Sequence, residues 1–146
     1  MKSNKIMYFF SIFLIIFAIV MMLGAFYLLL FPFKTVDYLN SPFPVLNANK
    51  TVEAGGQLQY QVNYCRYTES PAQVTRFLQN NIVYNLPDSD IKSNMGCNTV
   101  VTTIEIPKEV TCGEYKIMNS VRFEVNFLRT ITKNVETEIF VVTNCE

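Results

Sequence analysis

Residues 58–65, LQYQVNYC, alternate between apolar and polar side chains without a break. Leu58, Tyr60, Val62 and Tyr64 fall on one face of an extended chain, and the glutamines and asparagine between them fall on the other. Because side chains of a strand point alternately to its two faces, this pattern predicts a half-buried antiparallel strand. The turn before it is expected at Ala54-Gly55-Gly56.

Further short strands are predicted along the rest of the chain, and no segment after residue 34 shows a helical period. They are expected near 43–53, 74–78, 82–86, 98–106, 114–127 and 136–143. Polar breaks are expected at Asn119-Ser120 and Lys133-Asn134, and the stretch 87–96, PDSDIKSNMG, is expected to be a loop. About seven short strands in such a chain predict an all-β fold, with a Greek-key sandwich as the leading architecture.

The N-terminal segment predicts a membrane anchor. From Ile6 to Phe33 no side chain is charged, a run of 28 residues. Pro32 is expected to end the helix that this run forms. As a helix it would be roughly 40 Å long, more than the roughly 30 Å of a bilayer core. A cleaved signal peptide needs an apolar region of only about 7–15 residues and a small-residue cleavage site, so a retained signal anchor is predicted.

The predicted organisation has four parts: a cytoplasmic tail (1–5), a transmembrane helix (6–33), a tether (34–42) and an ectodomain (43–146). Lys2 and Lys5 precede the span, so the positive-inside rule leaves the N-terminus in the cytoplasm. All four cysteines follow the span, and an even number on one side indicates disulfides in an oxidising compartment. A periplasmic or extracellular C-terminal domain is therefore expected.

The stretch around Gly113 and Tyr115 resembles the tyrosine corner of immunoglobulin-like sandwiches. An ordinary turn glycine followed by a core tyrosine is the alternative. The chain has no tryptophan, and no cysteine lies two residues after Tyr115, so any likeness is to the broader Ig-like or fibronectin-like group.

That topology implies how the cysteines pair. The strand at 58–65 pairs with the strand at 98–106, and the strand at 114–127 pairs with the one at 136–143. Cys65 and Cys97 then meet at one end of the sandwich, and Cys112 and Cys145 meet at the other. Joining Cys65 to Cys112 would require a bond across a strand of roughly 26 Å, far beyond disulfide reach.

The sequence contains few candidate residues for catalysis or metal binding. The chain has no histidine and no C-x-x-C spacing, so neither a Ser-His-Asp triad nor a zinc site is expected. Asp88 and Asp90 are predicted to be a solvated turn rather than calcium ligands. Residues 34–146 carry ten basic and twelve acidic side chains without a basic stripe, so nucleic acid is not an expected partner. No enzyme activity, cofactor or metal is predicted.

Several ectodomain segments, among them SPFPVLN (41–47), QYQVNYCRYT (59–68) and EIPKEVTCGEYKI (105–117), resemble small membrane-anchored Ig-like proteins of tailed bacteriophages and their bacterial hosts. The resemblance implies a virus-encoded or bacterial envelope protein. It implies no particular activity, because the group has no diagnostic site motif to carry over.

Two functions remain from the sequence. In the first, the ectodomain binds another protein at a cell or viral envelope through loops 54–57 and 107–113 at its membrane-distal tip. The candidate binding residues are Ala54, Gly55, Gly56, Gln57, Lys108 and Glu109. In the second, the chain is a structural accessory subunit that packs beside a larger membrane complex through its helix. The bilayer is an expected partner in both.

Overall fold

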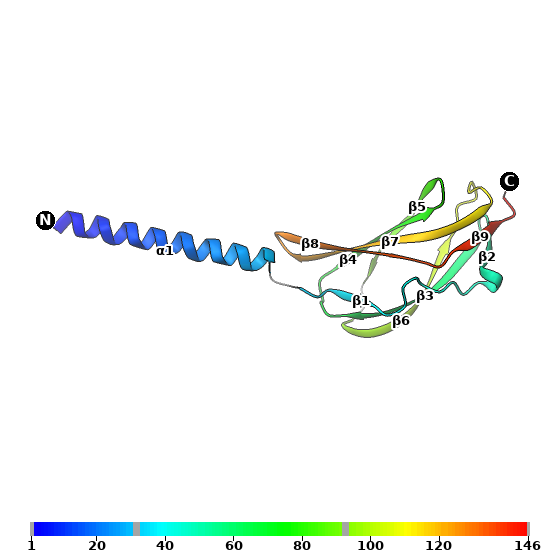
Figure 1. Ribbon diagram of the computed structural model, residues 1–146, viewed down its shortest axis with the longest axis horizontal. Coiled ribbons are helices and arrows are strands. Elements are labelled where there is room, and N and C mark those ends of the chain that lie inside the picture. The colour runs from blue at the N-terminus through cyan, green and yellow to red at the C-terminus, as the bar shows by residue number, and fades with distance from the viewer. Residues whose placement is uncertain (1, 31–32, 92–93, 146) are drawn as a thin grey trace. The chain divides into compact units, whose positions relative to one another are not determined.

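The computed structural model describes residues 2–30, 33–91 and 94–145. The chain divides into two compact units: a helical unit, to which the segment Asn126–Arg129 is also assigned, and a β-sheet unit that begins at Lys34 and resumes at Thr130. Figure 1 labels their elements along the chain.

The helical unit contains one long apolar helix, α1 (Lys2–Leu30). Its segment Met7–Leu30 is long and apolar enough to cross a membrane, and its most apolar stretch contains no buried residue. At 1.5 Å per residue these 24 residues span about 36 Å, which exceeds the thickness of a bilayer core. The predicted N-terminal apolar helix is confirmed, whereas its expected stop at Pro32 lies outside the described residues.

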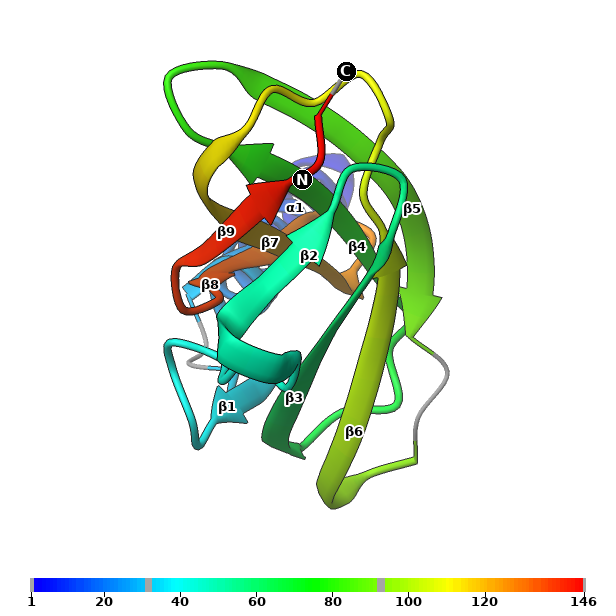
Figure 2. The ribbon, with the colours of Figure 1, turned by 90° about the vertical axis from the view of Figure 1, so that its right-hand side faces the viewer.

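The β-sheet unit consists of two sheets that face each other (Figure 2). The smaller sheet has the order β1-β3-β6, and the larger has the order β2-β9-β7-β4-β5, with β8 also paired to β7. The strands are β1 (Val36–Tyr38), β2 (Thr51–Glu53), β3 (Gln57–Arg66), β4 (Ala72–Gln79), β5 (Val83–Ile91), β6 (Gly96–Glu105), β7 (Gly113–Asn126), β8 (Arg129–Glu136) and β9 (Phe140–Thr143). The predicted all-β class is thereby confirmed for this unit.

The core lies between the two sheets and is rich in aromatic side chains. Those almost fully buried include Phe43, Tyr60, Tyr115, Phe123 and Phe140. Aromatic side chains bury large apolar areas, so they dominate the stabilisation of a core of this size.

Strand β3 has the alternation that the sequence predicts. Leu58, Tyr60 and Tyr64 are at most 7% exposed, whereas Val62 is only half-buried. The strand pairs antiparallel with β6 over its whole length, from Gln57 opposite Glu105 to Arg66 opposite Gly96. Because one face must be buried, this register is strongly specified.

The predicted pairing of the last strands is also confirmed. Residues 113–115 of β7 pair antiparallel with residues 140–142 of β9, and β2 adds to β9 in parallel. The two ends of the unit can then be defined. The entry end holds the start of β1 and the end of β3, where Val36 pairs with Arg66. The distal end holds the start of β7 and the end of β9.

Two predictions for the N-terminal part of the ectodomain are wrong. The expected tether 34–42 contains β1, which pairs with β3 and makes the ordered unit begin at Lys34. The expected strand at 43–53 is replaced by two isolated bridges, Phe43 to Thr137 and Val45 to Tyr60, and by the short strand β2. Extended segments of this kind find partners far along the chain, so local patterning does not reveal them.

The expected loop 87–96 is also wrong, because β5 continues through Pro87 to Ile91 and β6 begins at Gly96. Residues 92–93 of this loop lie outside the described residues. Proline is tolerated because β5 is an edge strand, and because the register with β4 shifts between Val74 and Arg76 to form an irregularity opposite it.

Neither expected polar break interrupts a strand. Strand β7 runs through Asn119-Ser120, and β8 runs through Lys133-Asn134. A polar side chain does not by itself end a strand, and Asn119 is paired within the ladder opposite Arg76.

Candidate functional site

The two loops predicted to bind a partner meet at the distal end. Ala54, Gly55 and Gly56 form the turn between β2 and β3, and Lys108 and Glu109 lie between β6 and β7. The loops are joined at Ile106: its carbonyl accepts a hydrogen bond from the Gly55 amide at 3.0 Å, and its amide donates to the Gly56 carbonyl at 2.9 Å. Gln57, the last residue of the candidate set, is the exposed first residue of β3.

Gly55 has a conformation that favours glycine, with a φ of +77°. A Cβ atom at this position would lie 2.9 Å from Cγ of Lys108. The turn thus allows the lysine stem to pack directly over the backbone of Gly55, and the two predicted loops form one surface.

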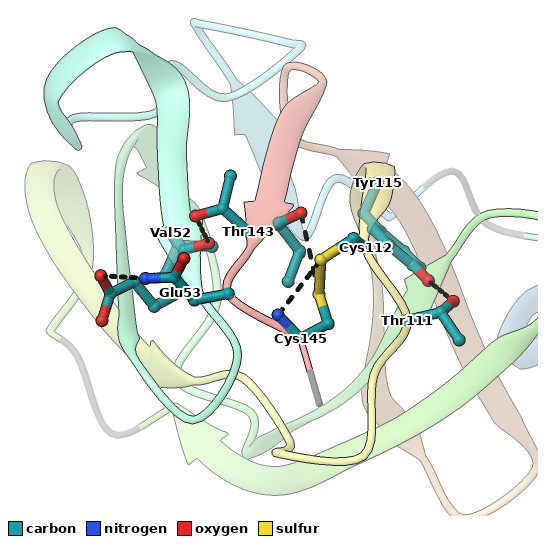
Figure 3. The surroundings of a disulfide bond; sticks show 9 residues. Val52, Glu53, Thr111, Cys112, Tyr115, Thr143 and Cys145 are labelled. Atoms are coloured by element: carbon teal, nitrogen blue, oxygen red, sulfur yellow. Dashed lines mark hydrogen bonds between the residues drawn. A yellow bond between two sulfur atoms is a disulfide. The ribbon is translucent and has the colours of Figure 1, made fainter.

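A disulfide fastens the same end of the unit. Cys112 and Cys145 are bonded, with their Cα atoms 5.5 Å apart, as the sequence predicts. Figure 3 shows the bridge beside β2 and β9, where the Cys145 amide lies 3.2 Å from the Cys112 sulfur and Thr143 Oγ1 donates to the Val52 carbonyl at 3.4 Å. The distal end is therefore held by covalent and hydrogen-bonded links between segments far apart in sequence.

Cys65 and Cys97 form the second disulfide, at the entry end. They occupy directly opposite positions of β3 and β6. Both predicted pairings are confirmed, and the bridges lie at opposite ends of the unit.

Tyr115 contributes to the rigidity of the distal end. Its side chain is 2% exposed, and its hydroxyl lies 2.9 Å from Oγ1 of Thr111 (Figure 3). In the tyrosine corner of Ig domains the hydroxyl bonds to an upstream backbone group. Here its partner is a side chain four residues upstream, so the local device is similar in position but different in the group that it contacts.

The turn between β4 and β5 adds an apolar element that the sequence reading missed. Ile82 and Val83 are 54% and 57% exposed. The turn lies near the 107–113 loop, since a Cβ atom on Gly113 would be 3.3 Å from the Asn80 side-chain amide. In the sequence, the only sign of an apolar turn was the pair of branched residues directly after Asn80-Asn81. The same pair is equally consistent with the start of a strand.

The distal end presents both apolar and charged side chains to solvent. Lys108 and Glu109 are exposed in the 107–113 loop. Within the described residues, no group of three or more potential metal ligands is present. Asp88 and Asp90 lie on the exposed edge strand β5 rather than in the predicted turn.

Asn119 is the second residue whose role the sequence reading missed. It was interpreted as a polar break, yet it is 3% exposed and faces the core from the middle of β7. The signal was present as an alternation in which the one polar member is Asn119: Tyr115, Ile117, Asn119, Val121 and Phe123. A single buried polar residue in an apolar series is more informative than the apolar residues around it.

Comparison of the sequence with models of protein families and with characterised proteins finds no match. Among solved structures, the C-terminal domain of Wzt is 8% identical, with a TM-score of 0.48, and the match covers 78% of this chain and 77% of that one. A Niemann-Pick type C2 protein from Japanese carpenter ant is 11% identical, with a TM-score of 0.46, and the match covers 75% of this chain and all of that one. Similarities at this level assign neither a family nor a function.

Proposed function

We propose that this chain is a single-pass membrane protein whose extracytoplasmic, Ig-like β-sandwich binds another protein through its distal end, without catalytic activity. The observation that carries the proposal is the composition of that end. Ile82 and Val83 are more than half exposed in the β4–β5 turn, and the charged Lys108 and Glu109 are exposed in the 107–113 loop of the same end. Exposed apolar residues with a polar rim are typical of protein-binding surfaces.

The proposed topology places residues 1–5 in the cytoplasm, α1 in the bilayer and the β-sheet unit outside. Lys2 and Lys5 support this orientation through the positive-inside rule. The two disulfides support it because such bonds persist in oxidising compartments. The resemblance to phage and bacterial membrane proteins makes the envelope of a bacterial cell the setting that we propose.

Connectivity explains why the distal end is the proposed contact surface. The chain enters the β-sheet unit at Lys34, next to the Cys65–Cys97 bridge at the entry end. The predicted loops and the apolar turn lie at the opposite end. A partner that approaches from outside the membrane would therefore reach them first.

Photocross-linking in the cells that produce the protein tests the contact surface. A benzophenone amino acid is placed at Val83, at Glu109 or, as a control of similar exposure, at Val101 on the outer face of β6. We expect Val83 and Glu109 to capture the same protein and Val101 to capture none. The Ile82→Asp variant should abolish capture from Glu109, because it puts a charge in the apolar contact.

Equal capture from all three positions, or from none, would contradict binding at the distal end. Protease added outside intact cells should digest the β-sheet unit, and protection of that unit would contradict the topology. Co-migration with a much larger assembly on native gels, without any contact at the distal positions, would favour the structural accessory subunit instead.

A further inference from the structure

The core of the β-sheet unit is divided into two clusters of buried side chains. The larger is near the distal end and includes Leu58, Ile106 and Phe140, and the smaller is near the entry end and includes Val74 and Phe123. A pocket of about 280 Å³ is lined by residues of both clusters and of both sheets. Ligand sites of proteins are usually apolar concavities with a few polar groups, so the polar groups here decide what the pocket can hold.

The central polar group is the side-chain amide of Asn119, on β7. Asn119 is only 3% exposed, and its Nδ2 has no hydrogen-bond partner among the described residues. A buried amide nitrogen without an acceptor is unfavourable, and such groups are rare in proteins. Asn119 lines the pocket, so an acceptor in the pocket would satisfy it.

The neighbouring hydrogen bonds fix which end of the amide is unsatisfied. The Tyr60 hydroxyl accepts a hydrogen bond from Arg76 Nε at 3.3 Å and donates its own proton to Asn119 Oδ1 at 2.9 Å. Burial raises the pKa of Tyr60, so the hydroxyl keeps this proton at neutral pH. Because Oδ1 is occupied by this bond, Nδ2 is the atom left to donate.

The charges on the pocket wall favour an anion. Arg66, Arg76 and Asp90 all line it, which gives a formal excess of one positive charge. Arg76 forms no ion pair with any carboxylate in the described part of the chain; its Nη1 donates to the Pro87 carbonyl at 3.4 Å. A guanidinium beside an amide donor suits a carboxylate, which accepts several hydrogen bonds.

The pocket is lined in part by the outer strands of the two sheets. β5 and β6 are each the last strand of their sheet and lie on the same side of the unit in Figure 2. Ser89 and Val100 line the pocket from these strands, and Val100 is 41% exposed. β5 and β6 are not paired with each other, so an opening between them would require no strand pair to separate.

We propose that this pocket binds a small monocarboxylate with an apolar body, its carboxylate accepting hydrogen bonds from Asn119 Nδ2 and Arg76. If each non-hydrogen atom of the ligand takes up roughly the volume of a water molecule, about 30 Å³, the 280 Å³ pocket holds about ten such atoms. The apolar body packs against Val62, Val74 and Val100, which line the pocket from three strands. The site is separate from the distal binding surface, and neither proposal depends on the other.

The test uses the full chain in lipid nanodiscs, with octanoate as the probe because its size matches this estimate. Calorimetric titration should show saturable binding of octanoate above that of empty nanodiscs. Val100→Phe fills the pocket and should weaken binding by at least about tenfold, while Val101→Phe, on the outer face of the same strand, should change it by less than about twofold. Absence of saturable binding, or equal affinity of these two variants, would overturn the proposal.

Two further variants test the head group. Asn119→Leu should weaken octanoate binding by roughly tenfold, because a carboxylate oxygen then loses its donor. Arg76→Gln should weaken octanoate but leave 1-octanol unchanged, because only the acid carries charge. Hydrogen exchange of β3 and β7 checks that each variant is folded. If 1-octanol binds wild type as tightly as octanoate does, or if Arg76→Gln weakens both equally, the assignment of a carboxylate is wrong.

Discussion

Removal of the Cys65–Cys97 bridge and of the Cys112–Cys145 bridge is expected to lower the free energy of global unfolding by nearly the same amount. The joined residues are 32 and 33 positions apart. In the loop-closure account of disulfides, a loop of this length contributes about 3.7 kcal/mol at 25 °C, and the two loops differ by less than about 0.1 kcal/mol. Any larger difference must come from the folded state.

The folded state predicts a local difference between the two bridges. Cys65 lies inside the long β3–β6 ladder, where the flanking pairs Tyr64–Asn98 and Arg66–Gly96 hold the strands together without the bridge. Cys145 follows the four-residue strand β9, which has only three paired positions with β7 and three with β2. Loss of the distal bridge should therefore allow β9 to open on its own.

Hydrogen exchange followed by mass spectrometry, on the full chain under non-reducing conditions, separates the two effects. In Cys112→Ala/Cys145→Ala, the amides of β9 should exchange through a local opening that is less costly than global unfolding. In Cys65→Ala/Cys97→Ala, the amides of β3 should still exchange only through global unfolding. Global losses that differ by more than about 1.5 kcal/mol, or unchanged protection of β9 relative to β3 in the distal variant, would refute this account.

Two further predictions concern the β-sheet unit. Leu58→Ala should lower the free energy of unfolding by about 2–5 kcal/mol because Leu58 is 0% exposed, whereas the exposed Gln59→Ala should change it by less than about 0.5 kcal/mol, as measured by denaturant unfolding. Hydrogen bonds from Lys50 and from the Val45 amide lower the pKa of Glu138 below its ordinary value of 4.5. Because the folded pKa is depressed, this stabilisation is present above pH 4.5 and is lost as pH falls through the folded pKa. The melting temperature of Glu138→Gln should therefore fall less between neutral and acid pH than that of the wild type, as measured by thermal melts in a pH series. An equal fall would contradict a stabilising role for the Glu138 carboxylate.

The sequence by itself determined the features that depend on local patterning. The uncharged run before Lys34 determined the apolar helix, because a helix satisfies its own backbone groups. The alternation from Leu58 to Tyr64 determined β3 and its buried face. Cysteine positions at the ends of predicted strands, read against an Ig-like strand order, were enough to predict both disulfides correctly.

The tertiary structure decided the features that depend on partners distant in sequence. β1 exists because β3 offers an edge to residues 36–38, and β5 passes Pro87 because an edge strand with a register shift tolerates the missing amide. The alternation around Asn119 places this residue on the apolar face of β7, but the local sequence does not show what its side chain contacts. Only the packing of β7 against β3, with the Tyr60 hydroxyl on one end of the amide and the pocket at the other, made it a buried donor.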